Sequence, residues 1–129
     1  MLLPTWPLDV EAIDRTRIVR FPDETRLDGG GLLTLREHLG RLREGLGPCG
    51  VVLDLGGVSF VFSDALDALL AFRREVRAVG GHLILCNLRP QIREVFTVTR
   101  LDRVFDIRPG GPCQAAPWRE DRNRLLMQA

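Results

Sequence analysis

The chain has 129 residues, of which 45% are hydrophobic and 27% charged, and its formal net charge is +1. These values are typical of a single folded domain and exclude an intrinsically disordered chain. The near-neutral charge gives no general electrostatic basis for binding nucleic acid. Every basic residue is an arginine and tyrosine is absent, which excludes Schiff-base lysines, a P-loop lysine and tyrosine acid–base catalysis.

The three cysteines, Cys49, Cys86 and Cys113, are odd in number and widely spaced. This set does not resemble a disulfide framework and indicates a reducing compartment. No CxxC pair or helical histidine pair is present to bind zinc, and we expect neither a metal nor a cofactor. The N-terminus lacks a basic leader region, and no apolar run approaches the roughly 18 residues of a membrane helix. The sequence therefore predicts a cytoplasmic protein with no membrane partner.

The first elements expected along the chain are two strands and a helix. Residues 8–13 and 16–21 are strand-like and closely spaced, which predicts a β-hairpin. Asp28 and three glycines then precede a run in which leucines recur at spacings of three and four. This stripe predicts a helix with one side facing the core, and Asp28 is positioned to cap it.

The middle of the chain alternates strands with helical patterns. Residues 51–55 and 82–86 are nearly all apolar, as strands covered on both faces are. Between them lie a strand-like run at 58–62 and a helical pattern from Asp64, which the glycines at 80 and 81 end. Two buried strands joined by a helix are most simply parallel.

The last third of the domain adds a helix from Pro90 to about Thr99 and a short strand or edge segment at residues 104–107. The predicted fold class is α/β: a single domain with a small mixed β-sheet of four to five strands covered by three to four α-helices. We expect this domain to span residues 1–108. Residues 109–129 form a C-terminal tail, with the composition for at most a short helix.

The helices in this arrangement begin where strands end, so we expect their N-termini to gather at one edge, at residues 28–31, 62–64 and 87–90. In open α/β sheets, ligands and partners bind at such an edge. Ser63 is predicted at the N-cap of the second helix, where its hydroxyl can accept a backbone hydrogen bond. A phosphoryl group on Ser63 would be stabilised by the helix N-terminus and would add nearly two negative charges.

The segment from residue 51 to residue 107 resembles a STAS domain, the fold of anti-anti-sigma factors. The resemblance rests on the order of its parts: an apolar strand with Asp54, a Val-Ser-Phe turn that reaches Ser63, an amphipathic helix, Gly-Gly, a second strand, and a helix closed by Leu-Asp-x-Val-Phe. Each part alone is a weak signal, whereas their combination in this order is specific. As architecture, the resemblance covers residues 8–108.

The resemblance implies a non-enzymatic regulator whose partner is a serine-kinase anti-sigma factor or another ATPase-like protein. In the family, the anti-sigma factor phosphorylates the first serine of the turn, which by position is Ser63. The partner-binding residues that the resemblance implies are Phe62, Ser63, Asp64, Ala65, Leu66 and Asp67, with Gly30 at the same edge. No oligomeric state follows from the sequence.

Three departures from the family pattern fall on the turn itself. Phe62 stands where the family has aspartate, Asp64 follows the serine, and Ala65 replaces a glycine. Phe62 offers an apolar anchor in place of a carboxylate, and Asp64 would repel a phosphate on Ser63. These departures keep open a second function: an unphosphorylated STAS scaffold or partner subunit, as in stressosomes or beside ABC-transporter ATPases.

A small enzyme that uses Asp54 or Ser63 is the third alternative. Ser59 matches only the first half of a GxSxG motif, so we expect it to be a strand or loop residue. A carboxylate such as Asp54 in an apolar strand more often binds neighbouring backbone or an arginine. We therefore predict no catalytic residue.

Overall fold

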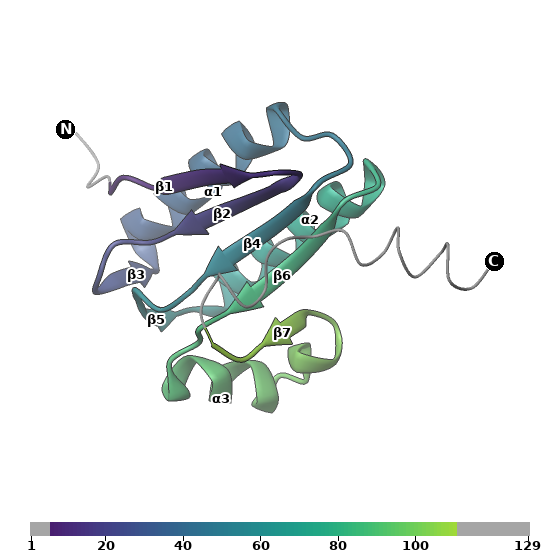
Figure 1. The fold of residues 1–129 in the computed structure, drawn as a ribbon. Coiled ribbons are helices and arrows are strands. Elements are labelled where there is room, and N and C mark those ends of the chain that lie inside the picture. The colour runs from purple at the N-terminus through teal and green to yellow at the C-terminus, as the bar shows by residue number, and fades with distance from the viewer. Residues whose placement is uncertain (1–5, 111–129) are drawn as a thin grey trace.

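The computed structural model describes residues 6–110, which form a mixed five-stranded sheet, a smaller two-stranded sheet and the helices that cover them. The larger sheet has the strand order β1-β2-β4-β6-β7 (Figure 1). Its strands are β1 (Asp9–Ile13), β2 (Thr16–Arg20), β4 (Gly50–Asp54), β6 (His82–Cys86) and β7 (Asp106–Arg108). β1 is antiparallel to β2, which confirms the predicted hairpin, and the other neighbours are parallel. The predicted α/β class with a mixed sheet is confirmed.

The smaller sheet was not anticipated by the sequence analysis. β3 (Thr25–Leu27) pairs in parallel with β5 (Val58–Val61), and neither strand belongs to the larger sheet. The strand predicted at residues 58–62 is therefore confirmed, but its pairing was missed. β3 escapes detection because its three residues include a single apolar one, which is too little to show a strand period.

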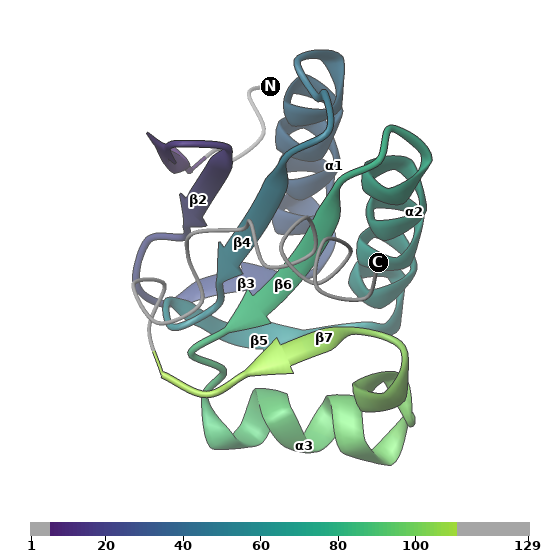
Figure 2. The same ribbon diagram turned by 45° about the vertical axis from the view of Figure 1, so that its right-hand side comes forward.

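Three helices surround the core: α1 (Gly29–Glu44), α2 (Ser63–Ala78) and α3 (Pro90–Val98). Figure 2 shows α1 and α2 side by side on one face of the larger sheet, with α3 below β5 and β7. The leucine stripe of α1 faces inward as predicted, since Leu35 and Leu39 are buried. α1 begins directly after Asp28, as predicted, whereas α2 begins at Ser63, one residue earlier than predicted.

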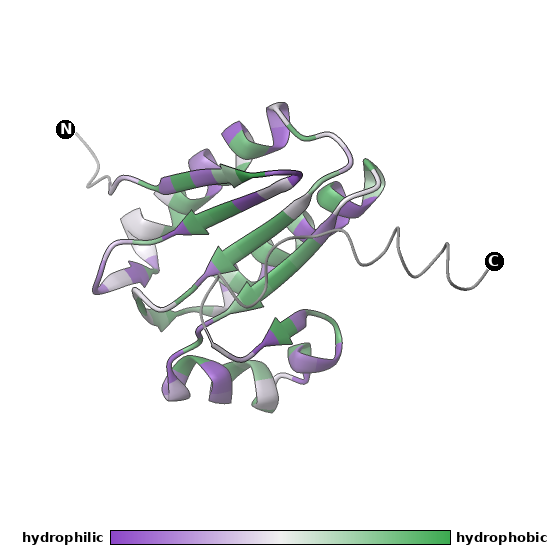
Figure 3. Cartoon of the chain, in the orientation of Figure 1, coloured by the Kyte–Doolittle hydropathy of each residue, from purple (hydrophilic) through white to green (hydrophobic). Residues whose placement is uncertain are grey.

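The main core lies between the larger sheet and the helices. Along β4, Val51 and Leu53 join the same cluster as Phe72 of α2, whereas Val52 points to the opposite face. This is the two-residue period of a strand, and both faces of the central strands are apolar (Figure 3). The cluster on the opposite face consists of Ile18, Val52, Ile84 and Cys86.

The end of the domain differs in detail from the prediction. The strand expected at residues 104–107 is β7, but it begins at Asp106 because a 3₁₀ helix, Leu101–Arg103, and a turn come before it. The predicted tail, residues 109–129, lies outside the described residues except for its first two.

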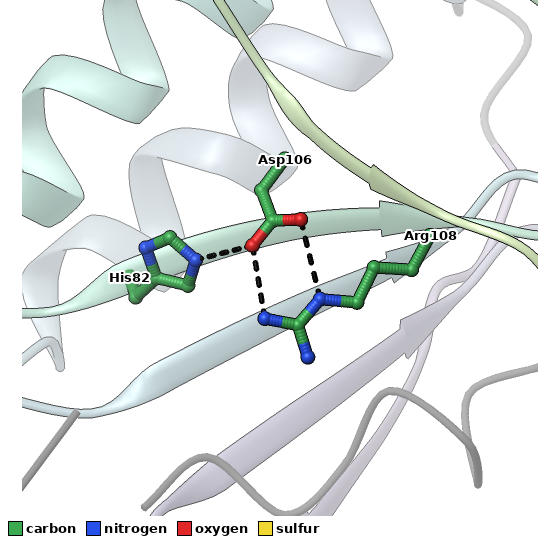
Figure 4. Close-up of polar contacts among 3 residues, drawn as sticks. All are labelled: His82, Asp106 and Arg108. Carbon is green, nitrogen blue, oxygen red and sulfur yellow. Dashed lines mark hydrogen bonds and ion pairs between the residues drawn. The ribbon is translucent and has the colours of Figure 1, made fainter. Parts of the chain in front are cut away.

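On the sheet face away from the helices, His82, Asp106 and Arg108 form a polar network (Figure 4). Asp106 Oδ2 lies 2.6 Å from His82 Nε2 and accepts a hydrogen bond from Arg108 Nη2 at 3.0 Å. Its other oxygen accepts from Arg108 Nε at 3.2 Å. Burial acts to raise the pKa of Asp106, but the hydrogen bonds from Arg108 and His82 outweigh it and hold that pKa below its ordinary value. The carboxylate is therefore stabilised in its charged form.

We expect Asp106→Asn to lower the free energy of unfolding at pH 7 by about 1 kcal/mol. Because the folded pKa is depressed, the carboxylate's contribution is complete above the ordinary aspartate pKa and is lost as the pH falls through the folded value. Urea unfolding of both proteins between about pH 5 and about pH 2 measures this, and the difference should shrink toward zero. The exposed Asp102→Asn serves as the matched control. A difference that does not change with pH would contradict this account.

Candidate partner-binding site

The edge predicted to bind a partner lies where the two strands of the smaller sheet end and the helices α1 and α2 begin. β3 ends at Leu27 and leads into α1, and β5 ends at Val61 and leads into α2. The amide of Phe62 donates a hydrogen bond to the Leu27 carbonyl at 3.3 Å, which ties the two helix starts together. The first turns of α1 and α2 are therefore neighbours, as the sequence analysis expected.

The third helix start lies elsewhere. Arg89, directly before α3, donates from Nε to the Gly56 carbonyl at 2.8 Å and from Nη1 to Glu24 Oε1 at 3.1 Å. Gly56 precedes β5, whereas Ser63 follows it, and in Figure 2 β5 runs from the end of β4 to the foot of α2. Residues 87–90 are therefore tied to the opposite end of β5 from Ser63. The expectation that all three helix starts share one edge is wrong.

Ser63 is the first residue of α2 and is exposed. The N-cap is Phe62, whose backbone is extended and whose carbonyl accepts from the amides of Ala65 and Leu66 at 3.0 and 3.3 Å. The prediction that Ser63 caps the helix is thus wrong by one residue, because the first turn closes on the Phe62 carbonyl. The Ser63 hydroxyl makes no hydrogen bond with any residue in the described range, so it is open to a partner.

The other residues predicted at this site divide between surface and core. Asp64 and Asp67 are exposed in the first two turns of α2, and Phe62 is 55% exposed. Ala65 and Leu66 are only 0% and 6% exposed. These two side chains belong to the inward face of α2 and pack in the main core. In this conformation they anchor the turn and do not offer a contact surface, which corrects their predicted role.

Two of the predicted site residues, Gly30 and Asp67, line hollows in the surface. Gly30 lines a hollow of about 390 Å³ that also contains Trp6 and the residues before β3. Asp67 lines a groove of about 270 Å³ between α1 and α2. Arg43 and Glu75, which also line this groove, form an ion pair across it at 2.7 Å. Gly30 and Asp67 therefore face different hollows.

Sequence reasoning missed Phe60, whose ring is stacked on that of Phe62, and Arg26, which lies over the Phe60 ring. Arg26 pairs with Asp28 at 2.9 Å, so the Asp28 carboxylate does not cap α1 although the residue occupies the N-cap position. The alternation within residues 58–62 already places Phe60 and Phe62 on one side of a strand. Without β3, however, nothing in the sequence connects Arg26 to them.

Two of the residues considered for catalysis, Asp54 and Ser59, have structural roles. Asp54 Oδ1 accepts hydrogen bonds from the Gly56 amide at 2.9 Å and from Asn87 Nδ2 at 3.1 Å, which holds the turn after β4. Ser59 lies in β5, and its hydroxyl donates to the Thr25 carbonyl at 3.3 Å. Both roles agree with the expectations from the sequence.

Cys86 is fully buried, and burial raises the pKa of its thiol to about 12, so the thiol stays protonated at neutral pH. Within residues 6–110, no three histidine, cysteine, aspartate or glutamate residues are grouped to hold a metal ion. No helix in the same range is both long and apolar enough to span a bilayer.

Comparison with known proteins decides the family. The STAS domain model matches residues 7–110. This chain belongs to the STAS domain family. Its fold is similar to an anti-sigma-factor antagonist domain protein from Planctomyces limnophilus, with a TM-score of 0.74, 24% identity, and coverage of 84% of this chain and 92% of that chain. It is also similar to the phosphorylated form of the Bacillus cell fate determinant SpoIIAA, with a TM-score of 0.63, 22% identity, and coverage of 84% and 96%.

One relative is closer in sequence to this STAS domain. BtrV of Bordetella bronchiseptica, named as a candidate anti-sigma factor antagonist, is 35% identical over 69 residues. The match covers 54% of this chain and 60% of BtrV. The STAS domain thus spans about 60% of the length of that relative.

Proposed function

We propose that this STAS domain is an anti-sigma factor antagonist, which binds a serine-kinase anti-sigma factor through the turn at Ser63 and is switched when Ser63 is phosphorylated. The observation that carries the proposal is the exposed hydroxyl of Ser63, the first residue of α2, which makes no hydrogen bond with any residue in the described part of the chain. The names of BtrV and of the similar structures support the general role. Such a protein acts by binding, in the cytoplasm, and needs no catalytic residue of its own.

The proposed switch is a phosphoryl transfer in which this chain supplies only the acceptor. The Ser63 hydroxyl oxygen forms a bond to the γ-phosphorus of ATP held by the anti-sigma factor, the bond to the β-phosphate oxygen breaks, and ADP leaves. The hydroxyl proton passes to a base on the anti-sigma factor. The exposure of Ser63 meets the geometric requirement, because another protein's active site has to enclose it.

The position of Ser63 determines what the phosphate does. Amides in the first turn of a helix have no partner within the helix, and the helix dipole is positive there, so both favour a phosphate on Ser63. The phosphate brings nearly two negative charges to a surface that already carries Asp64 and Asp67. A partner whose surface fits the neutral hydroxyl would then have to desolvate the phosphate, and any acidic group on that surface would be repelled by it.

The test combines the purified protein with the purified kinase-type anti-sigma factor encoded in the same genome. Size-exclusion chromatography measures the complex without ATP, and tandem mass spectrometry after incubation with ATP locates the phosphate. We expect a stable complex and a single phosphate on Ser63. Absence of a complex under both conditions would overturn the proposal.

The unphosphorylated scaffold stands as the second candidate function. The observation in its favour is the exposed carboxylate of Asp64, which gives the turn a permanent negative charge beside Ser63. In the same experiment it predicts tight binding with no phosphate on Ser63 after prolonged incubation with ATP.

We expect Asp64→Asn to raise the rate of Ser63 phosphorylation by roughly threefold to tenfold. Two unit charges about 6 Å apart repel by about 3 kcal/mol at an effective dielectric constant near 20, and water and salt at an exposed turn reduce this severalfold. Initial rates of phosphate incorporation measure the effect, which should diminish as salt is added. Asp102→Asn, an exposed substitution in the 3₁₀ helix before β7, is the control. An unchanged or slower rate in Asp64→Asn would contradict this account.

A further inference from the structure

A row of four side chains lies on the outer side of the smaller sheet, next to Ser63. Arg26 of β3 and Phe60 of β5 are opposite each other in the strand register. The next residue on each strand, Leu27 and Val61, is buried in the core. Asp28 and Phe62 lie two residues further along each chain, on the same outer side. The row therefore runs across both strands and ends at the residue before Ser63.

Each member of this row contacts the next. Arg26 Nη2 donates to Asp28 Oδ2 at 2.9 Å, and the Arg26 guanidinium carbon lies 4.4 Å from the centre of the Phe60 ring. The Phe60 and Phe62 rings are stacked, with centres 6.1 Å apart and an angle of 26° between their planes. These are favourable cation–π and offset-stacking geometries. They hold Phe62 from one side and leave it 55% exposed.

We propose that Phe62 selects the partner of this protein by burying its ring in an apolar socket on the anti-sigma factor that contacts Ser63. This inference rests on the proposed function. Residues 62 and 63 are adjacent, with Cα atoms about 3.8 Å apart, and both are exposed, so we expect a protein whose active site encloses the Ser63 hydroxyl to contact the Phe62 side chain as well. A single partner therefore occupies both positions.

The chemistry of Phe62 determines which partners fit. A partly exposed aromatic ring releases ordered water when it is buried, and such anchors supply most of the binding energy at protein interfaces. A partner with a carboxylate at this point would lose that group's hydration, gain no hydrogen bond from the ring and face its electronegative surface. Phe62 thus favours an apolar surface and discriminates against an acidic one.

Arg26 and Phe60 are positioning residues in this arrangement. They restrict the Phe62 ring before binding, so less conformational entropy is lost when the partner closes on it. Asp28 neutralises Arg26 on its far side, so the row presents an aromatic surface with no unpaired cation.

Isothermal titration calorimetry with the purified kinase-type anti-sigma factor tests the role of Phe62. We expect Phe62→Ala to weaken binding at least about tenfold, Phe62→Asp to weaken it at least as much, and Phe62→Leu to restore most of the affinity. Val98→Ala removes another exposed apolar side chain, on α3, and should leave the affinity unchanged.

The outcomes separate this inference from the proposed function. If Phe62→Ala binds within about twofold of the wild type, the selection role is overturned while the proposed function stands. If the wild type itself does not bind, both are overturned.

The positioning role has its own measurement, which needs no partner. ¹³C relaxation of the Phe62 ring reports its motion on the fast timescale, and we expect Arg26→Ala and Phe60→Ala to increase that motion relative to the wild type. Arg26→Lys keeps a cation over Phe60 and should show a smaller increase. Ring motion that is unchanged in both alanine variants would overturn the positioning role.

Discussion

Replacement of Gly31 by alanine is expected to lower the free energy of unfolding by about 3 kcal/mol or more. Gly31 lies in the first turn of α1, and a Cβ atom there would overlap the carbonyl oxygen of Arg26. This oxygen belongs to the backbone of β3, so it cannot rotate away as a side chain can. Either the start of α1 moves or β3 separates from β5. Urea unfolding monitored by circular dichroism measures the loss.

Gly40→Ala is the matched control in the same helix. A Cβ atom at Gly40 would have nothing within 4 Å, so the substitution gains helix propensity at no steric cost. We expect the free energy of unfolding to rise by about 0.5–1 kcal/mol. A similar change in both variants would show that the contact between α1 and β3 is not the cause.

Ser63→Ala is expected to abolish phosphate incorporation by the anti-sigma factor and ATP. The only other serine in the sequence, Ser59, is half-buried and bonded to the Thr25 carbonyl, so it cannot replace Ser63 as the acceptor. Because the Ser63 hydroxyl has no hydrogen bond within the described residues, the free energy of unfolding should change by less than about 0.5 kcal/mol. Intact-protein mass spectrometry and urea unfolding measure the two quantities.

Ser59→Ala provides the complementary control, since it leaves the proposed acceptor in place. It should incorporate one phosphate at a rate close to that of the wild type. If the Ser63→Ala variant incorporated phosphate, or if only the Ser59→Ala variant failed to do so, the assignment of Ser63 as the acceptor would be wrong.

The central strands and the helices could be predicted because the spacing of apolar residues along the chain indicates which of their faces are buried. Residues 51–55 are apolar throughout because β4 is covered on both faces, and the leucines of α1 recur at the helical spacing because one side faces the core. The parallel pairing of β4 with β6 followed from the helix between them. These features depend on neighbours in the chain.

The parts that were missed depend on residues far apart in the chain. β3 is recognisable only from its pairing with β5, more than thirty residues later. The burial of Ala65 and Leu66 follows from how α2 docks, and a family motif does not carry that information. The contact between Arg26 and Phe60 could not be predicted, because it depends on knowing both that β3 exists and which residues of β5 it pairs with. The place of Ser63 between a strand and a helix, in contrast, followed from the change of pattern at residues 58–64.

The pairing of β3 with β5 also limits how far this protein can be shortened. The segment with the recognisable motif begins at residue 51, long after β3. β5 pairs only with β3 in the described residues, so a fragment that starts at residue 51 would leave both edges of β5 with unpaired amides and carbonyls, and such strand edges recruit other chains. We therefore expect the amino-terminal quarter of the domain to protect the turn at Ser63 from self-association, even though it contributes no residue to the motif.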